Sequence, residues 1–445
     1  MIQAPNLNIL TDMKLPDITD IKLDNGANVS MMQFGTLPIV NMQIVLNVGS
    51  ISEMKDNQQW LSTFLANMMK EGSVKLHGQE IVEIFASYGG SIDISASDDH
   101  LFININVLSE FINEAIKIVA DVIRNPRFPK SEENRIKNDL LRNLELMLVD
   151  PQSITSARLN KLLFGNHPYG REFPDSNHLS KFNNFMLIDF YKKSIKSSES
   201  RFYLVGNFDS KKVIKQLHES FGNWNYGEGI KESVPKLMLP GQWSLINREN
   251  ALQSTIKIAV NIGQFNIENY HSFIVLNALL GGTFISRITT NIREDKGYSY
   301  SPISHLSINN NDCFWIQSAD VSTEVTTDSL SEIFYEIKKL SKNKIPKLEL
   351  DGMIMHLAGL HLIRFSTPRS IIGQLFHVDE VGIERTFYES YISSLKSVDE
   401  KSIQDLMNQF FSLDEFYIAI AGDKKIIDKK IQSMQEFINL NEVSF

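Results

Sequence analysis

The densest group of side chains that could do chemistry lies in the segment LLGGTFISRITTNIREDKGYSYSP, which begins at Leu279. Gly281 and Gly282 interrupt the end of an apolar helix, and Arg293 is followed seven residues later by Tyr300. A guanidinium held in place can donate to a peptide carbonyl or a carboxylate, and a phenol can donate beside a developing oxyanion. Taken alone, the spacing R-E-x-K-G-x-x-Y is more typical of a solvated arginine and a core tyrosine at a helix–strand junction.

The ten histidines are scattered and indicate no metal site. His356 and His361 are five residues apart, so they would point to different faces of a helix. Residues 98–100 (DDH) are adjacent in a strand-like stretch, where side chains alternate between faces. His167 lies in an HPYG segment, where we expect it to structure a loop rather than to bind a metal.

Nucleotide and nucleophile motifs are also missing from the sequence. Neither G-x-x-x-x-G-K-[ST] nor G-x-G-x-x-G occurs, so the Gly-Gly pair does not indicate a phosphate site. The single cysteine, Cys313, excludes an intrachain disulfide and a cysteine-based metal site, and its strand-like surroundings (DCFWIQ) favour a buried thiol.

The composition of the 445 residues is ordinary for a globular protein, with 42% hydrophobic and 22% charged residues. The formal net charge of −9 and the lack of any basic run argue against a nucleic-acid partner. No apolar run approaches ~18 residues, so we expect no membrane span. Residues 1–20 lack the basic start and apolar stretch of a signal peptide, and the compartment, cytoplasm or periplasm, stays open.

The chain repeats itself weakly at half its length. An apolar strand, a glycine turn and a lysine-rich amphipathic helix begin at Arg201 (RFYLVGNFDSKKVIKQL) and again at Glu415 (EFYIAIAGDKKIIDKKI). The preceding elements also agree in order: strands from Met42 and Ser254, apolar helices from Trp60 and Ser272, and long helices from Glu110 and Ser329. Any α+β protein alternates in this way, but agreement over six elements favours a duplication.

We therefore predict an N-terminal domain at residues 1–222, a linker at 223–243 and a C-terminal domain at 244–445. The linker is rich in glycine, proline and charge and lacks periodicity. Several strands alternate polar and apolar residues, with Ile103, Ile105 and Val107 on one face, which favours half-covered antiparallel sheets. The predicted fold class is α+β, with each half an antiparallel sheet packed against helices.

The segment from Leu279 resembles the second-domain motif of the M16 zinc peptidases, the pitrilysin, insulinase and mitochondrial processing peptidase family. That motif is a small-residue turn, then S-R-L, L-R-E and G-x-x-Y, and further segments with similar order and spacing extend the resemblance over nearly the whole chain. The resemblance implies that Arg293 and Tyr300 hold the substrate backbone, and Gly281 and Gly282 would let a peptide approach closely.

The first long helix departs from the family pattern. Active members carry H-x-x-E-H there, just before an M-L-x-x-G-T-like end. Here the helix reads WLSTFLANMMKEGS, which places Thr63, Ala66 and Asn67 where the two histidines and the glutamate should be. Thr63 and Asn67 still share one helical face, but a hydroxyl and an amide do not make a zinc site, and Ala66 cannot act as a base.

The third ligand of the family, a glutamate on a later helix, also has no counterpart here. Counting back from Pro151 puts Asn143 near that place, and Glu145 is out of register. We therefore expect no metal and no catalytic residue on this chain.

The resemblance implies a non-zinc, substrate-binding subunit of a heterodimeric M16 metallopeptidase that degrades or processes peptides, inactive alone, with zinc and base on a partner chain. The peptide would lie extended along a sheet edge. Two alternatives stay open. One is an inactive scaffold like the zinc-less core subunits of a respiratory complex, and the other is a peptide-binding or chaperone-like homodimer.

Overall fold

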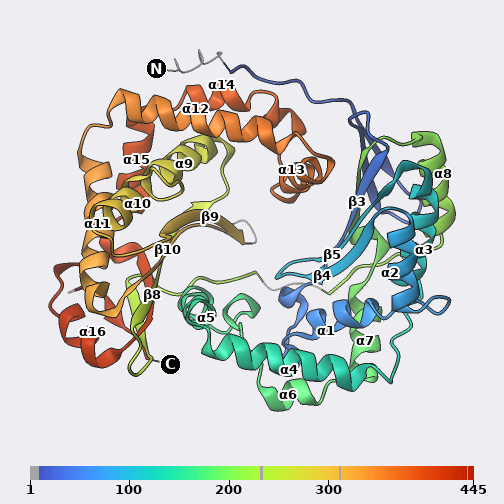
Figure 1. Cartoon of the computed structure of the whole chain (residues 1–445), viewed down its shortest axis with the longest axis horizontal. Helices are drawn as coiled ribbons and strands as arrows, with labels where there is room; N and C mark the ends of the chain where they lie inside the picture. Colours follow the sequence, from blue (N-terminus) through green and yellow to red (C-terminus); the bar gives the residue numbers. More distant parts are fainter. Residues whose placement is uncertain (1–9, 231–233, 310–311, 438, 445) are drawn as a thin grey trace.

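The computed structural model describes residues 10–230, 234–309, 312–437 and 439–444. Its described elements form two six-stranded sheets, one from each half of the chain, with helices on their outer faces. Figure 1 shows the two halves facing each other across a central space. The α+β class with two sheets packed against helices is confirmed.

All strands of the first sheet lie before residue 207 in the sequence. Its strands, in spatial order, are β1 (Ile18–Lys22), β2 (Asn28–Gln33), β6 (Ser200–Gly206), β3 (Ile39–Leu46), β5 (Leu101–Leu108) and β4 (Ser91–Ala96). Leu101, Ile103, Ile105 and Val107 of β5 are buried on one face, as their alternation predicts. The helices of this half are α1 (Leu61–Met69), α2 (Gly78–Ser87), α3 (Ile112–Arg124), α4 (Glu133–Val149), α5 (Pro151–Phe164), α6 (Ser176–Ser180), α7 (Asn184–Ser194) and α8 (Ser210–Phe221).

The second sheet begins at residue 242. Its strands, in spatial order, are β12 (Asn441–Glu442), β7 (Gln242–Asn247), β11 (Phe416–Gly422), β8 (Gln253–Gln264), β10 (Asp312–Ser322) and β9 (Ile303–Asn309). The helices of this half are α9 (Ile267–Leu280), α10 (Arg287–Thr289), the π-helical turn η6 (Thr290–Asp295), α11 (Thr326–Lys342), α12 (Lys347–Arg364), α13 (Pro368–Glu380), α14 (Tyr391–Lys396), α15 (Glu400–Phe410) and α16 (Lys424–Ile431).

Five strands of one sheet match five of the other in order, with β2-β6-β3-β5-β4 corresponding to β7-β11-β8-β10-β9. The sheets are mixed rather than purely antiparallel, because β2 runs parallel to β6 and β7 parallel to β11. The alternation pattern reports burial on one face and does not report strand direction, so it could not reveal these two pairs. The sixth strands differ: β1 is antiparallel to its neighbour, whereas β12 is parallel.

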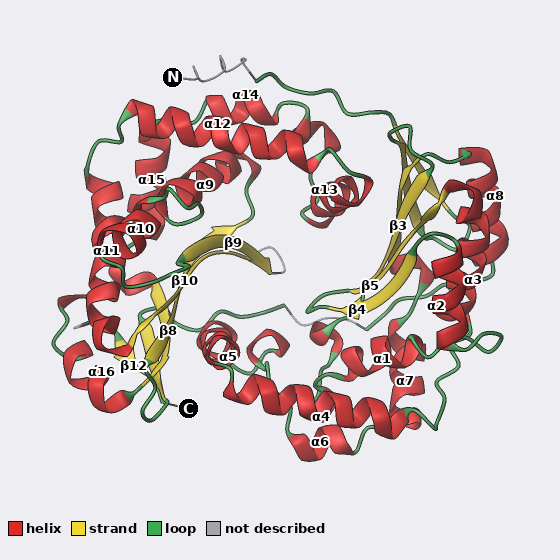
Figure 2. Cartoon of the chain, viewed as in Figure 1, coloured by secondary structure: helices red, strands yellow, loops and turns green. Residues whose placement is uncertain are grey.

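One helix of each half, α5 and α13, packs on the inner face of the other half's sheet. Leu159, Leu162 and Leu163 of α5 share a buried cluster with Ala259 and Tyr417 of the second sheet. Helix α13 packs in the same way against β3 and β6 of the first sheet. Figure 2 shows α5 and α13 on the inner side of the molecule, toward its middle.

The two exchanged helices start with the same local design. Asp150 caps α5 by accepting from the N–H of Ser153 at 2.8 Å, and Thr367 caps α13 by accepting from the N–H of Ser370 at 3.2 Å. A proline follows each cap, at the first helical position, where its missing N–H costs nothing. The boundaries predicted at 1–222, 223–243 and 244–445 stay a prediction, although Trp224 is buried in the first core and is not an exposed linker residue.

Candidate functional site

The segment from Gly281 to Tyr300 connects α9 to β9. Gly281 ends α9, and α10 follows a short turn in which the hydroxyl of Ser286 donates to the carbonyl of Thr283 at 2.7 Å. Helix α10 then widens into the π-helical turn η6, which carries Arg293. Single π-turns often occur at functional sites, because the extra residue shifts the side chains that follow.

Arg293 contacts two exposed aromatic rings. Its guanidinium carbon is 5.1 Å from the ring centre of Phe284 and 5.5 Å from the ring centre of Tyr300. Both distances are within the range of a cation–π contact. The two rings remain 75% and 84% exposed, whereas the arginine side chain is 28% exposed and its Nε lies 3.3 Å from Glu294. The two rings therefore contact the guanidinium while most of their own surface stays exposed to solvent.

Tyr300 precedes strand β9 and is not part of it. It lies in a bend, next to the isolated bridge between Ser299 and Val321, and β9 begins only at Ile303. The positive φ of Gly297, +66°, accommodates the reversal between η6 and this bend, as expected for a glycine. Tyr300 is 84% exposed, so its ring lies at the surface of this chain.

The two glycines of the motif are packed against the chain itself. A Cβ atom at Gly281 would lie 2.5 Å from Oε1 of Gln317 and 2.6 Å from Oγ of Ser304. A Cβ atom at Gly282 would collide with the amide of Asn277. Close packing against β9 and β10 is thus sufficient to explain Gly281, and the fold of the chain back on Asn277 of α9 explains Gly282. Contact of either glycine with a peptide stays a prediction.

The residues in the family's metal positions do not fit zinc. Thr63 and Asn67 are half-buried on one face of α1, but Ala66 is buried and has no polar atom to offer. On α4, Asn143 and Glu145 are exposed. Within residues 10–230, 234–309, 312–437 and 439–444, no three histidine, cysteine or acidic side chains gather in a group that could hold a metal ion.

The start of α1 is nevertheless fixed by hydrogen bonds to a buried carboxylate. The carboxylate of Glu53 is buried and accepts from the N–H groups of Trp60 and Ser62, both at 2.8 Å, and from the hydroxyl of Ser62 at 2.6 Å. Burial raises the pKa of Glu53 to about 7, against the effect of these hydrogen bonds. Arg171, just after the HPYG segment, donates to the backbone carbonyl of Glu53 and pairs with Asp56 at 2.7 Å. The HPYG loop thus positions this helix start.

The other candidate residues take structural positions. His167 accepts from the N–H of Tyr169 and opens a short 3-10 turn, which agrees with a loop-structuring role. His356 is exposed and His361 buried, on different faces of α12. Residues 98–100 lie in the turn between β4 and β5, so they are not on a strand as expected. Cys313 is buried in β10.

Sequence reasoning missed Phe284 and Glu53. Phe284 is an apolar residue in a tight turn between a Gly-Gly pair and a Ser-Arg pair. The sequence does not indicate which residues its ring would contact. The residue type and the turn are visible in the sequence, but no local pattern shows whether this ring is buried or exposed. No comparable signal distinguishes Glu53 in the sequence.

Two family profiles match the chain. Residues 35–175 match the family described as insulinase (peptidase family M16), and residues 181–357 match the peptidase M16 inactive domain. Arg293 and Tyr300 both lie in the second match.

Relatives cover most of the chain at low identity. The uncharacterized zinc protease YmxG of Bacillus subtilis is 23% identical over 393 residues, which are 88% of this chain and 95% of the relative. The non-peptidase homolog YmxG of Helicobacter pylori is 21% identical over 387 residues, covering 85% and 87% of the two chains.

Solved structures share the fold. A protease from Helicobacter pylori superposes with a TM-score of 0.85 at 14% identity, over 92% of this chain and 100% of that one. A peptidase M16 inactive domain from Pseudomonas fluorescens gives 0.81 at 21% identity, over 92% and 98%. No helix among the described residues is both long and apolar enough to cross a bilayer. With two matching profiles in tandem over most of residues 35–357, this chain belongs to peptidase family M16.

Proposed function

We propose that this chain is the non-zinc, substrate-binding subunit of a heterodimeric M16 metallopeptidase that degrades or processes peptides. One observation carries the proposal: Arg293 is oriented by two exposed rings, on a chain whose own metal positions hold Thr63, Ala66 and Asn67. An arginine fixed in this way serves no packing role, since Phe284 and Tyr300 remain largely in solvent.

The two side chains would act on the peptide backbone. The guanidinium of Arg293 offers several N–H donors in a fixed plane, and the phenol of Tyr300 offers one more. Donors that converge on one carbonyl region orient the peptide and stabilise negative charge that develops there. Zinc and the general base would come from the partner chain.

The peptide itself would be extended. The first sheet ends at β4 and the second at β9, so each offers an edge whose outer backbone groups face no further strand among the described residues. Strand β9 begins three residues after Tyr300, which would bring a peptide paired with that edge past the Arg293 site. Backbone pairing gives affinity without strict sequence demands, as suits a peptide-degrading enzyme.

The second candidate is an inactive scaffold. It is favoured by the match of residues 181–357 to the M16 inactive domain and by the name of the Helicobacter pylori relative, a non-peptidase homolog. A scaffold has no need of an arginine held between exposed aromatic contacts and an ion pair, so the two candidates differ in the effect of removing Arg293. A peptide-binding homodimer would show peptide affinity without any zinc-bearing partner.

The decisive experiment first searches the same genome for an M16 chain with an intact H-x-x-E-H motif, then mixes the two chains and follows hydrolysis of a quenched fluorescent peptide. We expect activity only in the mixture, and an Arg293→Ala loss of about 10²–10³ in rate with unchanged assembly, the usual cost of one preorganised donor. Lys296→Ala is the matched control, because Lys296 is a nearby cation that pairs with Glu332 at 3.1 Å and not with an aromatic ring. If the mixed enzyme keeps full activity with Arg293→Ala and also with Tyr300→Phe, the proposal is wrong and the chain is a scaffold.

A further inference from the structure

Asn291 is a buried polar residue in the same π-helical turn, η6, that carries Arg293, and it is only 9% exposed. Its Nδ2 donates to Oε2 of Glu332 and to Oε1 of Glu336, both at 2.9 Å. Glu332 and Glu336 lie four residues apart on α11 and therefore on one face of that helix. These three residues form the Asn291 bridge, which joins the turn η6 to α11.

The two acceptors determine which way the amide of Asn291 faces. Carboxylate oxygens accept hydrogen bonds, so the atom turned toward them is the amide nitrogen with its two N–H groups. The other amide atom, Oδ1, is buried and has no hydrogen-bond partner among the described residues. Because a buried acceptor without a partner costs free energy, the amide at this position is explained by its two donors.

The charges of the two carboxylates are balanced by lysines. Lys296 lies 3.1 Å from Oε1 of Glu332, the oxygen that Asn291 does not bind, and Lys339 lies 3.4 Å from Oε1 of Glu336. Asn291 adds two donors and no charge to this group. An aspartate in its place would have the same size but would bring a third carboxylate beside the other two.

The bridge acts on Arg293 through the geometry of the turn. Residues two apart in a helical turn point to nearly opposite sides of its axis. Asn291 accordingly faces α11, while Arg293 faces the rings of Phe284 and Tyr300. Since the bridge fixes the rotation of the turn about its axis, it sets the direction in which the guanidinium leaves the turn.

Tyr300 has an anchor of its own on the sheet. The carbonyl of Ile292, which adjoins Arg293, accepts from the N–H of Ser299 at 3.1 Å. The hydroxyl of Ser299 donates to the carbonyl of Asp320 in β10 at 2.8 Å. A rotation of the turn should therefore move Arg293 relative to Tyr300, which the sheet holds in place.

We propose that Asn291 is a positioning residue, which through its two carboxylate partners on α11 sets where the guanidinium of Arg293 lies against its aromatic neighbours. This placement is a property of the chain by itself. Its effect on catalysis rests on the function proposed above, because a misplaced donor lowers the rate only where a peptide is hydrolysed.

The test observes the surroundings of Arg293 in the purified full chain. Para-fluorophenylalanine is incorporated at Phe284, whose ring centre lies 5.1 Å from the guanidinium carbon, and the fluorine NMR signal is recorded. Arg293→Ala gives the signal of the ring without its cation. Asn291→Asp should move the wild-type signal most of the way toward that reference, because the repelled side chain no longer holds the turn.

Reversal of the hydrogen bonds should reverse the effect. In the triple variant Asn291→Asp/Glu332→Gln/Glu336→Gln, the new carboxylate accepts from two new amides, so both contacts form again with opposite polarity. Its fluorine signal should return to the wild-type position. A residue that only fills space would show neither the shift nor the recovery, because asparagine and aspartate have nearly the same volume.

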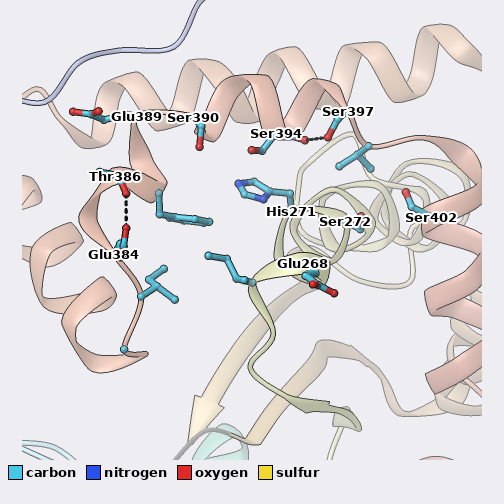
Figure 3. Close-up of a pocket in the computed structure, with 15 residues that line it drawn as sticks. Glu268, His271, Ser272, Glu384, Thr386, Glu389, Ser390, Ser394, Ser397 and Ser402 are labelled. Carbon is cyan, nitrogen blue, oxygen red and sulfur yellow. Dashed lines mark hydrogen bonds between the residues drawn. The ribbon is translucent and has the colours of Figure 1, made fainter.

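Two controls make the same chemical changes at exposed positions of this half. Asn343→Asp changes the residue that ends α11. Glu268→Gln changes a residue at the start of α9, on the wall of a cavity of about 950 Å³ that Figure 3 shows in close-up. Neither residue belongs to the Asn291 bridge, so both variants should leave the fluorine signal unchanged.

Because a third carboxylate in this group could impair folding, Glu332→Ala serves as a second variant at a half-buried position. It removes one of the two acceptors and should move the signal part of the way. Thermal unfolding checks that each variant is folded. If Asn291→Asp and Glu332→Ala both leave the signal at the wild-type position, or if the triple variant does not restore it, the proposal is wrong.

Kinetics separate this inference from the proposed function. In the mixed enzyme, Asn291→Asp should lower the rate about tenfold, and the triple variant should restore it. If the wild-type mixture hydrolyses no peptide, the proposed function fails, while the fluorine signal still decides the role of Asn291. A shifted signal in Asn291→Asp together with an unchanged rate in an active mixture would show that the placement of Arg293 does not matter for hydrolysis, and it would overturn the catalytic part of the proposal.

Discussion

The guanidinium carbon of Arg293 lies 5.5 Å from the ring centre of Tyr300, although a π-helical turn and a glycine reversal separate the two residues. Phe284 contacts the same guanidinium at 5.1 Å. The arginine is thus held by two aromatic contacts and by the ion pair of its Nε with Glu294 at 3.3 Å. This relationship makes the role of each ring separately testable.

Phe284→Ala should loosen Arg293 without removing it. We expect about a tenfold loss of rate in the mixed enzyme, smaller than the loss for Arg293→Ala, because the donor is still present but no longer preorganised. Since Phe284 is largely exposed, the free energy of unfolding should change by less than about 0.5 kcal/mol. Ile285→Ala is the control: Ile285 is 71% exposed and makes no cation–π contact with Arg293.

A second prediction concerns the junction between the halves. Arg385 pairs with Asp20 of β1 at 2.7 Å and with Asp379 of α13 at 3.0 Å, and Asp379 also accepts from the phenol of Tyr203 at 2.9 Å. Arg385→Ala should lower the free energy of unfolding by about 2 kcal/mol or more, because it leaves the partly buried Asp379 without its cation. Urea unfolding measures this, with Arg142→Ala on exposed α4 as a control that should change it by less than about 0.5 kcal/mol.

Buried histidines should make the fold sensitive to acid. Burial lowers the pKa of both His271 and His361 to about 4, below the usual 6.5. The unfolded chain therefore binds more protons than the folded chain between these values, and stability present above pH 6.5 is lost as the pH falls toward 4, by up to roughly 3 kcal/mol for each residue. Denaturant unfolding between pH 4 and pH 8 should show this loss, and the double variant His271→Phe/His361→Phe should flatten it.

The titration of Glu53 should change the stability in the opposite direction, with a gain as the pH falls. Its pKa is raised to about 7 in the folded chain, against 4.5 for an ordinary glutamate, so the folded chain binds the extra proton and gains stability as the pH falls from 7 to 4.5. The gain is again roughly 3 kcal/mol at most. Glu53→Gln cannot titrate, so it should make the acid loss of stability steeper than in the wild type. An unchanged pH profile in this variant would show that Glu53 ionises normally.

The sequence was sufficient for the two-sheet fold, because strand alternation and the order of elements are local patterns. The pairing of Arg293 with Tyr300 came from the resemblance to the M16 motif, since their spacing alone favoured a solvated arginine and a core tyrosine. The sequence was insufficient for the exchange of α5 and α13, which depends on contacts between residues more than 90 positions apart. A signal did exist, since Asp150-Pro151-Gln152-Ser153 and Thr367-Pro368-Arg369-Ser370 repeat one cap design at equivalent helices. The parallel pairing of β2 with β6 and the exposure of Phe284 are set by tertiary packing, which no local pattern reports.

The last prediction concerns the metal. The purified chain should hold no stoichiometric zinc and cleave no peptide alone, because Thr63 and Asn67 offer only a hydroxyl and an amide, and Ala66 offers no base. Replacing Thr63, Ala66 and Asn67 by His, Glu and His should still give weak binding, since counting back from Pro151 puts Asn143 near the family's third-ligand position on α4. Adding Asn143→Glu is the matched step: if the triple variant already binds one zinc per chain tightly by elemental analysis, the third position is not needed and Asn143 was wrongly placed. If only the fourfold variant does so, the register of α4 against α1 is the one that the sequence indicated. Peptide hydrolysis that appears only when the fourfold variant, with Arg293→Ala added, is mixed with the wild-type chain would show that Arg293 can serve a zinc site on another copy.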